Sequence, residues 1–306
     1  MVQFSVRPPS ADYLGFEATP EGISEASVAA EELGYDALVV NDHIIVDGNP
    51  RTLGPWGNTF DALTVLSFVA AKTSRIRIGT SVLNVPYRNP IATAKALATL
   101  DRMSGGRVIV GVGTGWSEPE FAALGVPFHE RGARTNEYLR IWQACWGPDP
   151  VSFSGKFFSF ADMHLKPKPI QQPVPIWVGG TSPAALKRAA RFASVWQPTP
   201  MELPALLIAQ AGLEAACEAI GRSDVPTTRM SFRVNFPSIT GAQTPPYGRP
   251  TGQGTPAEVA DDLRLFRDRA GVEAFQINYD GCENLGQMLR SMELFMTDVA
   301  PIVNQE

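Results

Sequence analysis

The chain contains the stretch Arg107-Val-Ile-Val-Gly-Val-Gly-Thr-Gly-Trp116, in which a β-branched run leads into a glycine-rich turn. The run is almost continuously apolar, which is typical of a parallel strand covered on both faces. The three glycines leave the backbone bare, so that N–H groups can approach a ligand that side chains would keep away. The stretch therefore predicts a buried strand that ends in a ligand-binding turn, and the alternative is a tight turn that binds nothing.

The next four residues, Ser117-Glu-Pro-Glu120, indicate that a helix begins directly after this turn. Serine is a favoured helix cap, and proline and carboxylates are common in the first helical turn. The free N–H groups at a helix N-terminus attract phosphate. A strand, a bare turn and a helix N-terminus in this order favour a site for the phosphate of a cofactor.

The rest of the chain repeats the order of strand and helix, which is typical of a parallel sheet built from βα units. Strands are predicted at residues 2–6, 36–40, 75–83, 107–112, 175–179, 193–197, 229–236 and 273–279. Helices are predicted after them at residues 22–33, 60–73, 90–103, 135–146, 182–191, 203–220, 256–270 and 283–299. Eight such units close into an α/β fold of the (β/α)8 TIM barrel type, here a single domain over residues 1–306, with the active site at the C-terminal ends of the strands.

Three connections at that face are longer than a βα turn needs, at residues 41–59, 114–134 and 237–255. We expect these extended loops to shape the active site, because the strands that they follow end there. Residues 237–254 are rich in proline and glycine. Such a loop is either a mobile lid or a passive part of the surface.

The composition favours work on small molecules. The 306 residues are 44% hydrophobic and carry a net charge of −5, whereas binding to nucleic acid or an anionic membrane needs a concentrated basic face. We find no uninterrupted apolar run of about 18 residues, so we expect a cytoplasmic protein without a membrane anchor. The three cysteines are widely spaced and have no metal or redox spacing.

The pair Asp42-His43 follows the second predicted strand. An Asp-His pair at a strand end can be a metal site, an acid/base unit or a loop anchor. Metal binding is disfavoured because the only other histidines, His129 and His164, lie in different loops and no metal-ligand spacing accompanies them. The acid/base unit and the loop anchor both remain open on the residues alone.

An ordered set of motifs covers nearly the whole chain. They are Asn41-Asp-His43, Gly79-Thr-Ser-Val-Leu83, Arg88-Asn-Pro90, Leu100-Asp-Arg-Met-Ser-Gly-Gly-Arg107, Gly111-Val-Gly-Thr-Gly-Trp116 and the stretch from Phe121 to Arg134. In this order they resemble the luciferase-like monooxygenase superfamily, and most closely its branch that uses the deazaflavin coenzyme F420. The resemblance implies a ring bound in the barrel mouth and a homodimer.

The resemblance also implies roles for individual residues. The phosphate-bearing tail is held by the turn of Gly113, Thr114 and Gly115 and by Gly179, Gly180 and Thr181, and a cis peptide between Ser81 and Val82 backs the ring. Asp42 and Trp116 complete the expected cofactor-binding set. His43 lies beside the reactive C5 of the deazaflavin, where an imidazole accepts or donates the substrate's proton near neutral pH, or only hydrogen-bonds the ring.

One residue departs from the pattern of the sugar-phosphate-oxidising relatives, which have a glutamate directly after the Gly-Thr-Gly turn. Trp116 stands at that position here and has no proton to exchange. Together with Trp56, Phe60 and Phe128 it suggests an apolar pocket for a small organic substrate, although Phe60 is equally compatible with core packing.

The expected function is therefore an F420-dependent oxidoreductase that transfers a hydride between C5 of the deazaflavin and a small organic substrate, with His43 as the catalytic residue. Two alternatives remain. One is a monooxygenase of the same superfamily with FMN as its cofactor, in which reduced flavin activates oxygen. The other is a flavin-binding barrel without turnover. Arg131 and Arg134 can bind an anion or form surface ion pairs with Glu130 or Glu137, so neither is placed in the site.

Overall fold

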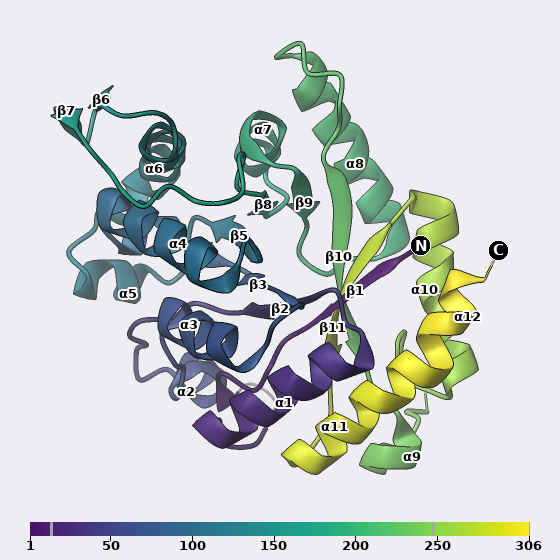
Figure 1. The fold of residues 1–306 in the computed structure, drawn as a ribbon. Helices are drawn as coiled ribbons and strands as arrows, with labels where there is room; N and C mark the ends of the chain where they lie inside the picture. Colours follow the sequence, from purple (N-terminus) through teal and green to yellow (C-terminus); the bar gives the residue numbers. More distant parts are fainter. Residues whose placement is uncertain (13–14, 247, 306) are drawn as a thin grey trace.

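The computed structural model describes residues 1–12, 15–246 and 248–305 and contains a closed parallel barrel surrounded by helices (Figure 1). The barrel strands are β1 (Gln3–Val6), β2 (Ala37–Val40), β3 (Arg77–Thr80), β4 (Leu83–Asn84), β5 (Val108–Gly113), β8 (Ile176–Gly179), β9 (Val195–Gln197), β10 (Thr227–Val234) and β11 (Ala274–Tyr279). They pair in the order β3-β2-β1-β11-β10-β9-β8-β5, and a further pairing of β3 with β5 closes the ring. The predicted TIM barrel is confirmed, with β3 and β4 as two parts of one barrel strand.

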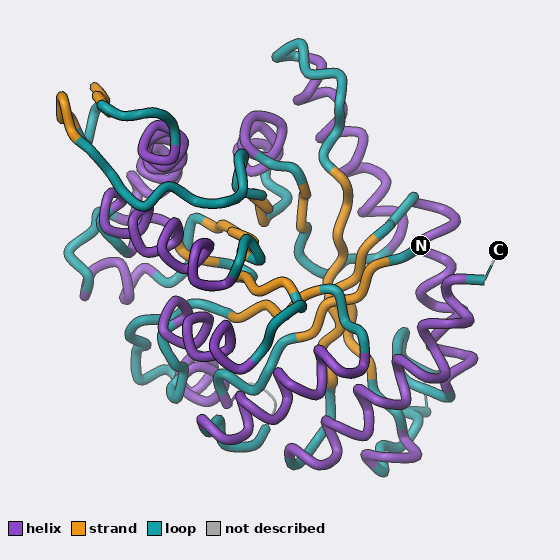
Figure 2. The backbone as a smooth tube through the Cα atoms, in the orientation of Figure 1, coloured by secondary structure: helices purple, strands orange, loops and turns teal. Residues whose placement is uncertain are grey.

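The predicted helices are present and form the outer ring around the strands (Figure 2). They are α1 (Pro20–Leu33), α3 (Ala62–Lys72), α4 (Pro90–Ser104), α6 (Arg131–Trp146), α7 (Pro183–Phe192), α8 (Leu203–Glu218), α10 (Pro256–Ala270) and α11 (Leu285–Leu294), the last continued by a π-helical turn (Phe295–Val299) and α12 (Ala300–Asn304). Side-chain caps explain where several begin. Thr19, Asn89, Ser182 and Thr255 each accept a hydrogen bond from a backbone N–H of the first turn.

The loops contain elements that the sequence pattern leaves undivided. Short helices form at α2 (Pro50–Trp56), α5 (Glu118–Ala123) and α9 (Pro237–Thr240), and 3₁₀ turns form at Val85–Tyr87 and Phe128–Glu130. The segment after α6 folds into an antiparallel hairpin of β6 (Val151–Ser154) and β7 (Ser159–Met163), which lies beyond α6 at the edge of the molecule (Figure 1). The hairpin is therefore set apart from the barrel strands.

The predicted strand 75–83 is interrupted. β3 ends at Thr80, β4 begins at Leu83, and the peptide bond between Ser81 and Val82 is cis. The strands are packed closely at this level, since a Cβ on Gly111 would lie 1.9 Å from the carbonyl oxygen of Thr80. The cis bond implied by the resemblance is thus present, and it divides one barrel strand into two.

Most of the hydrophobic core lies between the barrel and the helices, and a small second cluster of Ala37, Val39, Ile109 and Trp177 lies apart from it. Arg229 is 2% exposed, and its guanidinium lies 4.4 Å from the centre of the Trp177 ring. Burial lowers the pKa of Arg229 to about 9. Within the described residues, no helix is long and apolar enough to cross a membrane.

Candidate active site

The C-terminal ends of the strands bring the predicted site residues to one edge of the barrel, because all the barrel strands run in parallel. Val82 links the two predicted glycine turns. A Cβ on Gly113 would lie 2.5 Å from one γ-methyl of Val82, and a Cβ on Gly179 would lie 3.3 Å from the other. A Cβ at position 113 would therefore require the Val82 side chain to shift, and a Cβ at position 179 would be in tight contact with it, a constraint that the turn sequence alone does not reveal.

The two turns have the backbone conformations that glycine allows. Gly115 has φ +78°, and a Cβ there would lie 2.7 Å from the Phe121 ring. Gly180 has φ +98°, and its carbonyl accepts a hydrogen bond of 2.8 Å from the indole of Trp196. Ser182 caps α7, because its side chain accepts a hydrogen bond from the N–H of Ala185. Within the described part of the chain, the N–H groups of Gly115 and Thr181 donate no hydrogen bond to protein, so they are available to an anion.

His43 lies at this edge of the barrel, in the loop that follows β2. It is 7% exposed, and its Nδ1 lies 2.9 Å from Oε2 of Glu120, a residue of the first turn of α5. The same oxygen accepts a hydrogen bond of 2.9 Å from the hydroxyl of Tyr87. The other carboxylate oxygen accepts from the backbone N–H groups of Ile44, at 2.7 Å, and Ile45, at 3.3 Å. Glu120 thus holds both the imidazole and the loop that follows it.

Glu120 is a functional candidate that the sequence analysis missed. The pattern Ser117-Glu-Pro-Glu120 indicates only a carboxylate at the start of a helix, which is normally solvated, but Glu120 is 1% exposed. Burial raises the pKa of Glu120, and the hydrogen bonds from His43, the Ile44 amide and Tyr87 outweigh burial and hold the pKa below its ordinary value. Burial together with the Glu120 charge raises the pKa of Tyr87. The carboxylate is therefore ionised and Tyr87 remains a hydrogen-bond donor.

Aromatic rings flank His43. The Trp56 ring centre lies 5.2 Å from the imidazole, and the Trp116 ring lies edge-on at 5.8 Å. Trp116 is 59% exposed and is thus open to a ligand. Phe128 lies further out, against Phe121 at 5.3 Å, and Phe60 packs against the main core. Of the four aromatic residues proposed for the pocket, Trp116 and Trp56 contact His43.

Asp42 points to a different neighbour. Its carboxylate is fully buried and forms a two-pronged contact with Arg88, with distances of 2.7 Å and 2.8 Å, while the N–H of Asn84 donates to the same group at 2.9 Å. Burial raises the pKa of Asp42, and the Arg88 guanidinium opposes this effect. The oxygens of Asp42 are therefore occupied within the protein, which favours the loop-anchor interpretation for this residue.

A polar network that was not predicted crosses the barrel beside Ser81. Ser81 Oγ donates to Gln276 Oε1 at 2.6 Å, and Gln197 Nε2 donates to both of these atoms at 2.8 Å. The carbonyl of Ser81 accepts from Arg7 at 3.0 Å. The sequence offers one indication of this network, because Gln276 lies within an otherwise apolar strand and Gln197 lies at the end of another. The pattern does not show which residues they bond to, because these come from strands far apart along the chain. The network fixes the position of Ser81.

Two buried polar atoms in this region lack a partner among the described residues, namely Asn41 Nδ2 and Gln197 Oε1. Buried polar groups are normally hydrogen-bonded, so one free donor and one free acceptor point to a partner from outside the chain, such as a ligand or water, with complementary groups. A ring that carries amide and carbonyl groups, with an anionic tail at the glycine turns, fits this donor set. No group of three His, Cys, Asp or Glu in the described ranges is arranged to hold a metal ion.

The loop of residues 237–255 is tied down near its end. Arg249 forms hydrogen bonds of 2.7 Å and 2.9 Å with Asp262 of α10, and the N–H of Gly252 donates to the same carboxylate at 2.7 Å. This part of the loop is thus anchored to the surface, while Tyr247 lies outside the described residues. The two arginines after the turn have partners within the protein. Arg134 pairs with Glu130 at 2.7 Å, and Arg131 stacks on Phe128.

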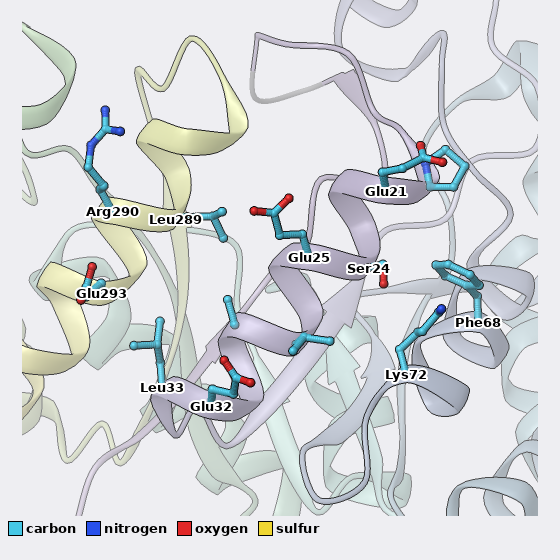
Figure 3. A pocket seen from close by; sticks show the side chains of 13 residues that line it. Glu21, Ser24, Glu25, Glu32, Leu33, Phe68, Lys72, Leu289, Arg290 and Glu293 are labelled. Carbon is cyan, nitrogen blue, oxygen red and sulfur yellow. The ribbon is translucent and has the colours of Figure 1, made fainter.

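A groove of about 950 Å³ lies on the outer wall, between α1, α3 and α11 (Figure 3). Carboxylates such as Glu25 and Glu32 stand along it, and Phe68 and Leu289 line its apolar part. None of the residues that line it belongs to the glycine turns or contacts His43. The strand ends, and not this groove, hold the candidate active site.

The arrangement defines a TIM barrel with two bare glycine turns beside a histidine–carboxylate pair, a design suited to a bound cofactor. The chain belongs to the luciferase-like monooxygenase family, whose model matches residues 3–240. The family that the motifs indicate is therefore confirmed.

The curated relatives include both F420-dependent and FMN-dependent enzymes. An F420-dependent glucose-6-phosphate dehydrogenase of Amycolatopsis mediterranei (strain U-32) is 37% identical over 176 residues, which are 56% of this chain and 51% of that relative. An FMNH(2)-dependent dimethylsulfone monooxygenase of Pseudomonas putida is 39% identical over 138 residues, 44% of this chain and 38% of that relative. The chain spans about half the length, or less, of these two curated relatives.

Solved structures agree on the fold. An F420-dependent secondary alcohol dehydrogenase in complex with an F420–acetone adduct superposes with a TM-score of 0.81 at 19% identity, covering 99% of both chains. At this identity the likeness concerns the fold alone.

Proposed function

We propose that the protein is an F420-dependent oxidoreductase that transfers a hydride between C5 of the deazaflavin and a small organic substrate. The observation that carries the proposal is the pair of His43 and Glu120, which lies at the strand ends next to the glycine turn that leads into Trp116. The F420-dependent relative at 37% identity supports the choice of cofactor. The enzyme's own task is to position the two reactants and to move a proton.

The residues at the mouth have distinct tasks in this proposal. Gly113, Thr114 and Gly115 bind the anionic tail on one side, and Gly179, Gly180 and Thr181 bind it on the other. Ser81 and Val82 lie behind the ring, and Trp116 covers its open side. When bound, the deazaflavin supplies a carbon that accepts or returns a hydride. The free groups of Asn41 and Gln197 are suited to the polar edge of the ring.

The hydrogen bond to Glu120 determines which nitrogen of His43 can act. Because the Glu120 carboxylate is ionised, Nδ1 carries hydrogen and donates to it. Nε2 then has a free lone pair, which accepts the proton that the substrate releases as it loses a hydride, and returns the proton in the reverse direction. The charge of Glu120 stabilises the imidazolium that forms.

Titration of the purified protein with F420 and with FMN tests the proposal, because it fixes the reaction class before any substrate is known. We expect F420 to bind more tightly, and hydride transfer to be lost in His43→Ala. Tighter binding of FMN would instead favour the monooxygenase, which the dimethylsulfone monooxygenase relative supports as the second candidate. Cofactor binding without hydride exchange over a broad substrate panel would favour a barrel without turnover.

The proposal includes a homodimer, which the family resemblance implies, and a cytoplasmic location, which is the expectation from the sequence pattern. Sedimentation equilibrium measures the oligomeric state, and fractionation of cells determines the location. A sedimenting mass near the 33.1 kDa of one chain would contradict the homodimer.

A further inference from the structure

An apolar rim surrounds His43, which we define as Ile44, Ile45, Trp56 and Trp116. Ile44 is 44% exposed and Ile45 is 51% exposed, and both directly follow the histidine. The two tryptophan rings flank the imidazole. Large apolar side chains that cluster in the open beside a reactive group indicate a surface that a ligand covers.

The rim is held in place by its backbone. Both isoleucine N–H groups donate to Oε1 of Glu120, and the other oxygen of that carboxylate is occupied by His43 and Tyr87. The hydrogen bonds fix the two residues while they leave their side chains in solvent. The part of the rim formed by Ile44 and Ile45 is therefore held in a fixed position beside His43.

The carboxylates closest to His43 in the fold are not available to a substrate. Glu120 is buried, with both oxygens hydrogen-bonded, and the neighbouring Asp42 is paired with Arg88. The ring contacts of His43 are with tryptophans. A charged group placed against the four apolar side chains of the rim would lose hydration, and neither of these two carboxylates is free to pair with a cationic one, whereas each Å² of apolar surface covered there gains roughly 25 cal/mol.

We infer that the enzyme selects an uncharged, mainly apolar alcohol, or the corresponding carbonyl compound in the reverse direction, through the rim beside His43. The inference rests on the proposed function. The carbinol carbon loses its hydrogen with the bonding electron pair to C5 of oxidised F420, the O–H bond breaks with its proton going to His43 Nε2, and the carbon–oxygen bond becomes double. One base and one two-electron acceptor balance this reaction, and His43, which the two tryptophan rings flank, is the base.

The test compares cyclohexanol with glucose 6-phosphate in the F420-loaded enzyme, and compares the wild type with Ile44→Ser, Ile45→Ser and Trp116→Glu. Ile208→Ser is the matched control, because Ile208 is 75% exposed but lies on α8. We expect cyclohexanol to be the better substrate. Each rim variant should lower kcat/KM for it by about tenfold, mainly through KM, since a lost apolar contact is worth roughly 10- to 200-fold. The Kd of F420 should stay unchanged in the two isoleucine variants.

Preferred turnover of glucose 6-phosphate, or an unchanged KM for cyclohexanol in all rim variants, would overturn the inference while leaving F420-dependent hydride transfer intact. A failure of the proposed function shows itself separately, as absent F420 binding. Binding of cyclohexanol to the cofactor-free protein, followed by tryptophan fluorescence, then tests whether the rim binds an apolar alcohol independently of F420. Binding that weakens in Ile45→Ser but not in Ile208→Ser supports apolar selection, and absent or unaffected binding refutes it.

Discussion

His43 and Glu120 form a buried hydrogen-bonded pair, with Nδ1 and Oε2 separated by 2.9 Å across 77 residues of sequence. The pair joins the loop after β2 to the first turn of α5. Tyr87 and two backbone amides complete the set of donors around the carboxylate. Every donor points toward the charge, so the pair holds the imidazole in one orientation and one tautomer.

The first prediction concerns Glu120→Gln, which keeps the size of the side chain but removes its charge. We expect kcat to fall by roughly tenfold or more, because the amide neither enforces the tautomer nor stabilises the protonated imidazole. The acid limb of the rate profile for substrate oxidation should move to lower pH for the same reason. Steady-state kinetics from pH 5 to pH 9 would measure both effects.

Glu118→Gln is the matched control for this variant, because Glu118 lies in the same helical turn but is exposed. It should leave the rate and its pH profile unchanged. If both variants behave alike, Glu120 acts only through the stability of α5 and not through His43.

The second prediction separates the two interpretations of Asp42. Asp42→Asn removes the buried carboxylate that pairs with Arg88 and leaves the largely buried guanidinium with only the half-exposed Asp61 as an ionic partner, so the free energy of unfolding should fall by about 3 kcal/mol. Asp61 contacts the same guanidinium at 2.6 Å but is 47% exposed, so Asp61→Asn should cost no more than about 1 kcal/mol. Urea denaturation measures both. Full stability with weakened F420 binding would instead assign Asp42 to the cofactor.

The barrel could be predicted from sequence because its signals are local. Residues 131–146 show them together, with the stripe of Tyr138, Ile141, Trp142 and Cys145 at helical spacing, and the observed helix contains this stripe. Caps such as Thr19 and Ser182 lie within a few residues of the helices that they start. Helix ends were less certain. A glycine directly after a helix is often a left-handed cap, but Gly147 has a φ of −73° and gives an extended ending.

The site could be predicted only in part, because its decisive contacts are long-range. The glycine turns and Asp42-His43 are visible as motifs, and the resemblance pointed to Ser81 and Val82. The burial of Glu120 depends on the loop after β2 folding over α5, which no pattern at residues 117–120 encodes. Arg88 was noted within a motif, but its partner Asp42 lies 46 residues away. Motifs locate the strand ends, and packing decides what each side chain does there.

The third prediction is a pH-dependent contribution from Glu31. Its carboxylate accepts hydrogen bonds from the N–H groups of Ser74, Arg75 and Ile76, and joins α1 to the start of β3. Burial raises its pKa, but these bonds together outweigh burial and lower the pKa from the ordinary 4.5 to about 2. Because the folded pKa is depressed, the stabilisation is fully present above pH 4.5 and is lost as the pH falls toward 2.

Glu31→Gln should therefore lower the midpoint of urea unfolding at pH 7, and the difference from wild type should shrink as the pH falls through this window. Glu32→Gln, at the neighbouring exposed position, should have no such effect. A difference that stays constant from pH 7 to pH 3 would show that the charge of Glu31 is irrelevant to it.

The last prediction tests whether Val82 is the reason for glycine at position 113. In Gly113→Ala the new Cβ would lie 2.5 Å from a methyl of Val82, so we expect a loss of about 1–3 kcal/mol in the free energy of unfolding and weaker F420 binding. Gly48→Ala is the control, because nothing lies within 4 Å of a Cβ there. Adding Val82→Ala removes the clashing methyl, so the double variant should regain stability in a double-mutant cycle. Additive losses would mean that Gly113 is required for another reason, such as the approach of a ligand to its backbone.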